Sequence, residues 1–366
     1  MEVRFFKKSE RQLLLDSIDR LWAHNHIYVR KPEVLEHLVL NTPYRAEFAG
    51  EDNYSFIGEW DDTGKVVGLC GAMPQRVNVF GKEYPSVSVT VWIVDRECPT
   101  ANGLLLRQYA YKDKPAVMVG LGNSEINMNL HRKMHGAFCL DHLPRWVAFN
   151  PNRLEDVRQN LLKPEQRDIF LPTFKAVPRS SRITVAEDFE REEWDEFYFR
   201  EFAPYMIGTQ RDYTFLNWRY GESPVLKYHI LTAKNEAGKY VGGAVIRLEK
   251  ILDDRFVVGR ILEFITLDAE ASLALANAII NYAPEALLWD FYCLSAITAY
   301  GLEAVGLQKI SPYMNLDPLP TRFQPIDNVQ INAMILLRRE ILAQINPLDG
   351  YQWYITKGDN DQDRAN

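Results

Sequence analysis

The sequence predicts an α/β protein built from two similar halves, each with a mixed, mostly antiparallel sheet flanked by helices. Its 366 residues correspond to about two domains of ordinary size. Hydrophobic residues make up 47% and charged residues 25%, which is an ordinary globular balance. Tyr54 and Gly64 recur as Tyr228 and Gly238 at one constant spacing of 174 positions (228 − 54), and the order of the surrounding elements recurs with them. This repetition indicates a duplication.

The first half begins with a strand at residues 3–6 and a helix entered at Ser9, a residue favoured at helix N-caps. A second helix follows Pro32. Alternating apolar side chains then predict three strands separated by two turns, at residues 54–60, 66–80 and 84–95. Three more elements complete this half: a helix at 102–111, a strand at 116–121 and a helix at 126–135.

The second half repeats this order from Tyr228 onward, which sets the expected domain boundaries. We predict domains at residues 1–150 and 181–345, joined by a proline-bearing linker at 151–180. The last segment, 346–366, is acidic and polar, and its simplest interpretation is a frayed tail.

The composition disfavours several classes of protein. A net charge of -7 argues against a nucleic-acid partner, because such proteins need a basic surplus to neutralise phosphates. Four widely spaced cysteines form neither a zinc ribbon nor a disulfide framework. The N-terminus lacks the apolar run of a signal peptide, and no apolar stretch is long enough for a membrane span. We therefore expect a cytoplasmic protein.

The order strand, two helices, three antiparallel strands, helix, strand, helix, strand resembles the GNAT superfamily of N-acyltransferases. In that family, acyl-CoA lies where the fourth strand splays from the fifth, and its pyrophosphate sits on amides at the start of the next helix. The resemblance implies an acyl-CoA cosubstrate, no metal, and a binding site in the first half at Ile93, Val94, Ala101, Asn102, Gly103, Leu104, Leu105 and Asn123. The equivalent loop of the second half has no glycine and carries Glu270, so it is expected to be a poor host for an anion.

The polar side chains of the fourth strand are the candidate catalytic residues, Ser86, Ser88 and Asp95. Strict alternation places Ser88 and Asp95 on opposite faces, whereas a bulge, common in this strand of the family, would bring them to one side. Asp95 could then hold or deprotonate the amine. The alternative is a strand-end carboxylate that contacts loop amides.

Two tandem units with Trp218, Arg219 and Tyr220 before the second sheet are similar to the acyltransferases of bacterial surface-polysaccharide pathways. That resemblance implies a nucleotide-linked amino sugar as the acceptor, bound between the two halves. The candidate acceptor-binding residues are Arg219, Tyr220, Arg247, Glu249, Arg260 and Glu263. Cross-strand ion pairing and aromatic core packing are the simpler interpretations of the same residues.

Two other functions stay open. A non-catalytic sugar-binding or protein-binding module would explain why both pyrophosphate loops depart from the family pattern. A ligase that uses aminoacyl-tRNA shares the fold, but the acidic balance disfavours RNA contacts. His131 and His135 have the spacing of zinc ligands, yet no third ligand accompanies them, so we expect a solvated helix face. The oligomeric state is open, and a homodimer is compatible with the sequence.

Overall fold

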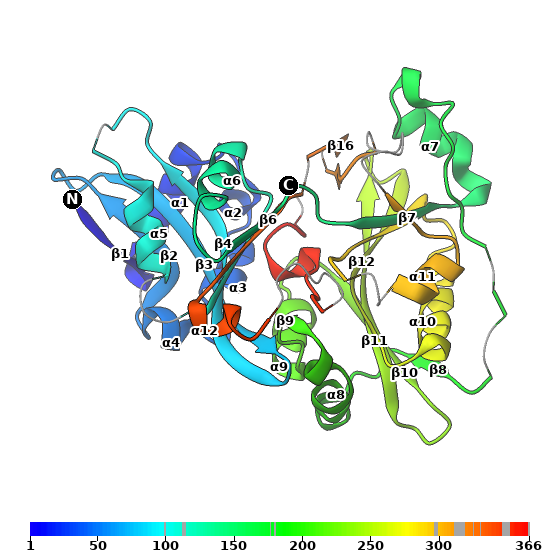
Figure 1. The fold of residues 1–366 in the computed structure, drawn as a ribbon. Coiled ribbons are helices and arrows are strands. Elements are labelled where there is room, and N and C mark those ends of the chain that lie inside the picture. The colour runs from blue at the N-terminus through cyan, green and yellow to red at the C-terminus, as the bar shows by residue number, and fades with distance from the viewer. Residues whose placement is uncertain are drawn as a thin grey trace.

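The computed structural model consists of two sheets, each flanked by helices, lying side by side with the end of the chain between them (Figure 1). The structure describes residues 1–98, 100–111, 115–175, 177–178, 181–295, 299–310, 319–324, 326–329, 331–345 and 352–364. Among these residues, no helix has the length and apolarity needed to cross a bilayer. The fold class predicted from the sequence is confirmed.

The first sheet has the strand order β1-β2-β3-β4-β5-β17-β6, with β9 pairing on the far end of β3. Its strands are β1 (Glu2–Lys7), β2 (Asn53–Trp60), β3 (Val66–Val79), β4 (Lys82–Val94), β5 (Val117–Leu121), β6 (Ala137–Leu140), β9 (Ile207–Thr209) and β17 (Ala333–Leu337). β4 and β5 are parallel, and the other pairs along this order are antiparallel. The three strands predicted before residue 95 all form, within two residues of their expected bounds.

The second sheet has the order β14-β7-β13-β12-β11-β10-β8. Its strands are β7 (Arg145–Phe149), β8 (Thr184–Ala186), β10 (Tyr228–Lys234), β11 (Tyr240–Ile251), β12 (Phe256–Thr266), β13 (Leu288–Tyr292) and β14 (Gln308–Ile310). Here too a single parallel pair, β12 with β13, lies at the centre of the sheet. A small hairpin of β15 (Arg322–Phe323) and β16 (Ile326–Asp327) lies outside both sheets.

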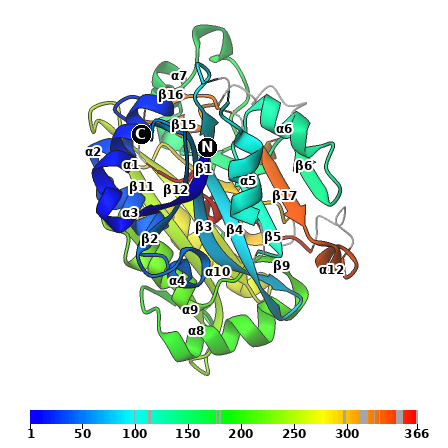
Figure 2. The same ribbon diagram turned by 90° about the vertical axis from the view of Figure 1, so that its left-hand side faces the viewer.

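The helices cover the faces of the two sheets, and Figure 2 shows the first sheet in front of the second. The helices of the first half are α1 (Arg11–Leu21), α2 (Ile27–Arg30), α3 (Pro32–Val39), α4 (Arg45–Ala49), α5 (Gly103–Tyr111) and α6 (Glu125–His131). The later helices are α7 (Leu154–Asn160), α8 (Arg191–Phe197), α9 (Tyr213–Leu216), α10 (Ala269–Tyr282), α11 (Tyr300–Ala304) and α12 (Arg339–Leu342). Short 3₁₀ turns lie at Lys8–Glu10, Pro151–Arg153, Pro164–Gln166, Ala203–Tyr205 and Lys357–Asp359, and π turns at Tyr198–Phe202 and Asn217–Gly221.

The two halves exchange strands, so the boundaries expected at residues 150, 180 and 345 do not follow the sheets. β7 precedes residue 150 but pairs with β13 and β14 of the second sheet. β17 belongs to the expected second domain but pairs with β5 and β6 of the first sheet. Residues 151–180, expected as a linker, contain α7. Each sheet is therefore completed by a strand from the opposite half of the chain.

Residues 352–364 are largely buried, which corrects the expectation of a frayed tail for this part of 346–366; the rest of that range lies outside the described residues. Residues 352–364, called here the C-terminal segment, run between the two sheets (Figure 1). Trp353, Tyr354 and Ile355 belong to the hydrophobic cores, and Asp359, Asp361 and Asp363 are also buried. Acidic residues can occupy an interior only when cations pair with them. Asp359 and Asp363 pair with arginines distant in the sequence, and Asp361 pairs with Arg364, three residues further on.

Candidate functional site

Each sheet opens at its central parallel pair. β4 and β5 run together up to the Val89–Gly120 pair and then separate, because β5 ends at Leu121 while β4 continues to Val94. We call this opening the first fork. β12 and β13 run together up to the Ile261–Phe291 pair and separate in the same way, forming the second fork. The two forks face the C-terminal segment from opposite sides.

Of the two alternatives for the fourth strand, strict alternation and a bulge, the structure shows the bulge, at the first fork. Cys70 and Ala72, two positions apart in β3, pair with Trp92 and Val89, which are three positions apart in β4. The extra residue bends the strand and reverses its alternation beyond Val89. The pairing of β11 with β12 shifts at the corresponding place, so the duplication extends to this irregularity.

The C-terminal segment enters the first fork through two amide side chains. Nδ2 of Asn360 donates to the carbonyl oxygen of Val89 at 2.8 Å and to Oγ of Ser88 at 2.8 Å. Nε2 of Gln362 donates to the carbonyl oxygen of Leu121 at 3.2 Å. Ser88, a predicted catalytic residue, therefore lies at the fork, and its buried hydroxyl contacts the end of the chain.

Asp95 lies elsewhere, at the outer end of β4. Its carboxylate pairs with Arg20 at 3.1 Å and with Lys65 at 3.2 Å, and it accepts the amide of Glu97 at 3.1 Å. The Glu97 amide, together with Lys65 and Arg20, holds the pKa of Asp95 below its usual value. The structure does not bring Asp95 into contact with Ser88. These contacts match the alternative interpretation, a strand-end carboxylate bound to a loop amide.

Two further hydroxyls of β4 are buried, those of Ser86 and Thr90. Within the described part of the chain, neither Oγ atom has a hydrogen-bond partner. Ser86 lies three residues before the strands separate and lines a different small cavity, next to Tyr44 and Pro115. Thr90 lies immediately beyond the last strand pair, so of these two hydroxyls only that of Thr90 belongs to the fork.

The loop expected to bind pyrophosphate already contains a carboxylate. Glu59 of β2 is fully buried and accepts the amide of Asn102 with both oxygens, at 3.0 and 2.9 Å. Oδ1 of Asn102 in turn accepts the amide of Leu104 at 3.1 Å, and Gly103 accepts the indole of Trp92. Sequence reasoning missed Glu59, because an acidic residue inside a strand carries no signal that it caps a distant helix.

The structure brings most of the predicted acyl-CoA residues together at the end of β4 and the start of α5: Ile93, Val94, Ala101, Asn102, Gly103, Leu104 and Leu105. Leu104 and Leu105 are exposed on α5. Asn123 lies apart from this group, at the end of β5. Its side chain donates to the carbonyl of Gly120 at 2.9 Å, and its amide donates to Asn332 at 2.7 Å.

The six predicted acceptor-binding residues are brought together in the layer between the sheets, where all are buried: Arg219, Tyr220, Arg247, Glu249, Arg260 and Glu263. Their partners are protein groups. Arg247 pairs with Asp363 at 2.7 Å and with Glu249 at 3.3 Å. Arg247 and Arg260 are cross-strand neighbours, as the ion-pairing interpretation supposed. Burial alone would raise the pKa of Asp363, but Arg247 holds it well below its usual value.

The other members of this group also bind the C-terminal segment or its neighbours. Arg219 donates to the carbonyl oxygens of Gly358 at 3.1 Å and Asn360 at 3.0 Å. The hydroxyl of Tyr220 donates to Glu263 at 2.8 Å. Burial raises the pKa of Glu263 although Arg211 lies 3.3 Å away. The cleft expected between the halves is therefore largely filled by the end of the chain.

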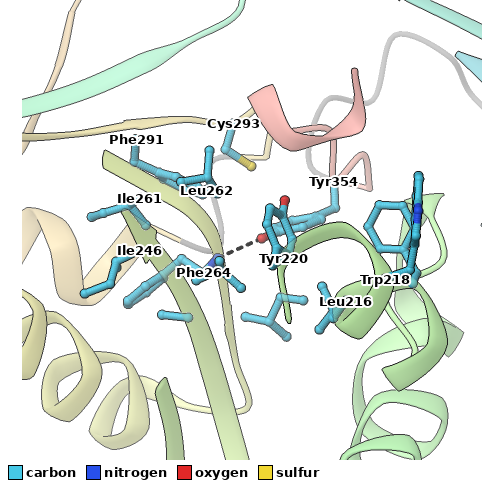
Figure 3. Packing of buried hydrophobic residues seen from close by; sticks show 14 of the residues in the cluster. Leu216, Trp218, Tyr220, Ile246, Ile261, Leu262, Phe264, Phe291, Cys293 and Tyr354 are labelled. Atoms are coloured by element: carbon cyan, nitrogen blue, oxygen red, sulfur yellow. Dashed lines mark hydrogen bonds between the residues drawn. The ribbon is translucent and has the colours of Figure 1, made fainter. Parts of the chain in front are cut away.

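The second fork is filled by an aromatic side chain. The hydroxyl of Tyr354 accepts the backbone amide of Phe264, a residue of β12 beyond the separation point, at 2.9 Å (Figure 3). The chain on either side of Tyr354 also pairs with its surroundings. The amide of Leu294 donates to Ile355 at 2.9 Å, and Thr356 forms a bridge with Cys293.

The start of α10, where the second half would bind pyrophosphate, is capped from within. The carboxylate of Asp268 accepts the amide of Ala271 at 2.8 Å, which satisfies one of the free amides of the helix and places a negative charge there. Glu270 pairs with Arg182 at 2.9 Å. This loop was expected to receive an anion poorly, and its contacts agree with that expectation.

Comparison with known proteins gives a match at the level of the fold. No protein-family model and no curated protein matches the sequence. Among solved structures, the chain is similar to a probable N-acyltransferase from Enterococcus faecalis, with 15% identity and a TM-score of 0.54 over 91% of this chain and 71% of that one. It is also similar to a GCN5-related N-acetyltransferase from Anabaena variabilis, with 12% identity and a TM-score of 0.53 over 91% and 72%.

A third similar structure is the N-myristoyltransferase of Saccharomyces cerevisiae with bound myristoyl-CoA. Its identity is 12% and its TM-score 0.51, over 92% of this chain and 78% of that one. The protein thus has the fold of the GNAT-type N-acyltransferases over most of its length, as the order of its elements predicted.

Proposed function

We propose that the protein is a GNAT-type acyltransferase that moves an acyl group from coenzyme A to an amine. The observation that carries the proposal is the first fork, a parallel pair that opens at a bulge and leaves β4 free beyond Val89. The yeast structure with the same fold holds an acyl-CoA, which supports a CoA thioester as the donor.

The free part of β4 supplies the chemistry that such a transfer needs. Backbone amides that face no partner strand can polarise a thioester carbonyl, because they donate in a site shielded from water. The neutral amine then attacks the carbonyl carbon, the carbon–sulfur bond breaks, and the thiolate leaves while the nitrogen loses a proton. Under this proposal Asn360 marks the inner end of the acyl groove, since it already binds Val89 and Ser88 there.

The test is the release of free thiol by the full chain. Acetyl-CoA and longer acyl-CoAs are incubated with a panel of primary amines and amino sugars, and thiol is followed against a reaction without amine. We expect amine-dependent release for at least one pair. No CoA binding in calorimetry, together with no turnover on any amine, would instead favour the second candidate, a non-catalytic module. The carboxylate of Glu59 on the loop amides is the observation that favours this candidate.

For the acceptor, we propose an amino sugar carried on a nucleotide, the substrate class that the tandem arrangement resembles. Arginines concentrated between the sheets are compatible with a phosphorylated acceptor. A complete nucleotide sugar needs more room than the C-terminal segment leaves, so its binding requires that segment to shift. The panel above therefore includes amino sugars both free and as nucleotide conjugates.

A further inference from the structure

A cavity lies between described residues in the layer between the sheets. It is narrow, with room for about one water molecule (about 10 Å³) as the lining side chains stand, and it is lined by β11, β12, the β15–β16 hairpin and the C-terminal segment. The charged side chains that line it are five cations and one carboxylate: Arg247, Arg260, Arg322, Lys357, Arg364 and Glu249. Such a surplus of buried positive charge is costly unless anions balance it.

The protein's own carboxylates do not balance it. Arg247 pairs with Asp363, Arg364 with Asp361, and Arg260 with Asp290. These pairs do not leave a carboxylate to spare, because Asp290 is shared with the buried Arg145 and Glu249 is shared by Arg247 and Arg260. In the described part of the chain, six cations meet four carboxylates: Arg145, Arg247, Arg260, Arg322, Lys357 and Arg364 against Glu249, Asp290, Asp361 and Asp363.

The two cations left over are Arg322 and Lys357. Neither lies within ion-pair distance of a carboxylate among the described residues. The side chain of Lys357 is buried and lies over the ring of Tyr292. Burial, with Arg260 nearby, lowers the pKa of Lys357 to about 7, because the more distant carboxylates Asp363, Asp290 and Glu249 offset the burial only in part.

Two guanidinium nitrogens of the lining also lack partners. Nη1 of Arg260 and Nε of Arg364 are buried and, within the residues that the structure describes, donate to no hydrogen-bond acceptor. The nearest carboxylate oxygen to Nη1 of Arg260 belongs to Glu249 and lies 3.7 Å away, beyond hydrogen-bond distance. Because buried donors are almost always satisfied in native proteins, these nitrogens point to a missing acceptor.

We propose that this cavity binds an oxyanion, a carboxylate or phosphate group that the acceptor amine carries. Guanidinium groups match the planar or forked geometry of such groups, and several of them here converge on one small space. Ligand cavities usually measure about 300–1,000 Å³, so this one is far smaller. It can take at most the charged group of the acceptor, and only when a lining side chain such as the half-buried Arg322 moves aside. The chemistry is the same whether the oxyanion is a carboxylate or a phosphate.

The cavity lies next to the first fork. Gln362 lines the cavity and donates to the carbonyl of Leu121, where β5 ends. Its amide group also fills the space beside Gly122, whose φ of 67° and close contact with Gln362 leave no room for a larger residue. An oxyanion bound here would be separated from the acyl groove by one side chain. This link to the acceptor rests on the proposed function, whereas the oxyanion site does not.

The experiment is calorimetric titration of the full chain with inorganic phosphate and, separately, with acetate, in the absence of acyl-CoA. We compare Arg322→Gln, which removes an unpaired and only half-buried cation, with Arg255→Gln, an equal charge change at the exposed turn between β11 and β12. We expect saturable binding of at least one anion, weakened about 10-fold or more by Arg322→Gln and unchanged by Arg255→Gln. Binding of phosphate alone identifies a phosphate site, and binding of acetate alone a carboxylate site.

The proposal is overturned if neither anion binds, or if both variants bind as the wild type does. A thermal melt of each variant establishes that it is folded before titration. The link to turnover is tested separately, because Arg322→Gln should raise the KM of an anionic acceptor and leave that of its neutral analogue unchanged. If the anion binds but no acyl transfer is found, the oxyanion site is supported and the proposed function is refuted. If Arg322→Gln raises the KM of the anionic and the neutral acceptor equally, only the link between the oxyanion site and the acceptor is refuted.

Discussion

The first and second forks have the same framework and different contents. Each is a parallel pair that opens beside a shift in the neighbouring antiparallel pair. In the second fork, the hydroxyl of Tyr354 accepts the amide of Phe264, and the adjoining residues pair with the chain beyond β13 (Figure 3). In the first fork, the contacts of the described C-terminal segment are made by the amide side chains of Asn360 and Gln362.

The difference shows how a duplicated unit can divide its roles. An aromatic ring that packs into a fork and satisfies its free amide turns that fork into part of the core. Small polar groups leave the neighbouring strand edge unpaired, so the first fork keeps the capacity for a ligand. The C-terminal segment supplies the side chains that enter both forks. Its start, at Trp353, is apolar, and its end, near Gln362, is polar.

The comparison predicts unequal losses of stability when each fork is emptied. Tyr354→Ala removes a fully buried aromatic side chain and should lower the free energy of unfolding by about 3–5 kcal/mol. Asn360→Ala leaves the carbonyl of Val89 without its donor and should cost about 1–3 kcal/mol. Urea unfolding measures both. Equal losses would mean that the two forks are packed alike, and Tyr354→Phe isolates the hydrogen bond to Phe264.

A second prediction concerns CoA, which the first half is expected to bind. Gly103→Asp places a carboxylate beside Glu59 at the start of α5, where it should weaken CoA binding by about 10-fold or more. A Cβ at Gly103 would lie 3.2 Å from Nε1 of Trp92, so only a small adjustment is needed. Calorimetric titration with CoA measures the change.

The matched control is Ala269→Asp, at the exposed first position of α10 in the second half. It should leave the Kd for CoA within about twofold. Ala271 is unsuitable because it is fully buried. A loss of CoA affinity in the control and not in Gly103→Asp would assign the cosubstrate to the second half.

The features of the fold that depend on local sequence patterns could be predicted from the sequence. The hairpin strands and the repeat from Tyr54 to Tyr228 follow from alternation and spacing, whereas the bulge in β4 was suggested only by the family resemblance. The strand exchange does not, because Arg145–Phe149 and Ala333–Leu337 are short apolar runs that would fit either sheet. The five residues of each strand do not determine which strand it pairs with.

Sequence reasoning named some residues that the structure places at the forks or between the sheets, such as Ser88 and Arg247, but not their contacts. Asp359, Asp361 and Asp363 alternate with polar residues, a pattern that also describes a solvated tail. Their burial depends on cations far away in sequence, such as Arg247 for Asp363. Only the fold brings these charges together, and the same holds for Glu59 and the start of α5.

A third prediction concerns the polar half of the C-terminal segment at Lys357. The groups that face this ammonium are Arg260 and Glu249 from neighbouring strands, Asp290 and Tyr292 from β13, and Asp363 from the segment itself. Since the pKa of Lys357 is lowered to about 7, the side chain is charged below that pH and neutral above it. A bound oxyanion favours the charged form.

Sulfate, which keeps its charge across this range, should therefore bind about 10-fold more weakly at pH 8 than at pH 6. Lys357→Gln should abolish most of that pH dependence, and the exposed Arg255→Gln should preserve it. Calorimetry at four pH values measures the slope. A wild-type affinity that does not change between pH 6 and pH 8 would exclude Lys357 as a ligand of the anion.

The smallest expected effect is that of Asp95→Asn at the outer end of β4. If the first fork is the only reactive part of that strand, then Asp95 is a structural carboxylate held by Arg20, Lys65 and the amide of Glu97. Ion pairs near the surface contribute little, so the free energy of unfolding at pH 7 should fall by about 1 kcal/mol or less. The value of kcat should stay within about twofold, whereas loss of a general base would lower it by about 10²-fold.

The pH dependence of stability separates these two roles of Asp95 further. Its pKa is lowered in the folded state, so its contribution is present above the ordinary carboxyl pKa of about 4 and disappears as the pH falls through the folded value. Wild type and Asp95→Asn should therefore differ in stability at neutral pH and converge in acid. If the two stabilities converge in acid and kcat is unchanged, the chemistry is confined to the first fork. A hundredfold loss of kcat with stability unchanged at every pH would instead extend the reactive region of β4 to its outer end.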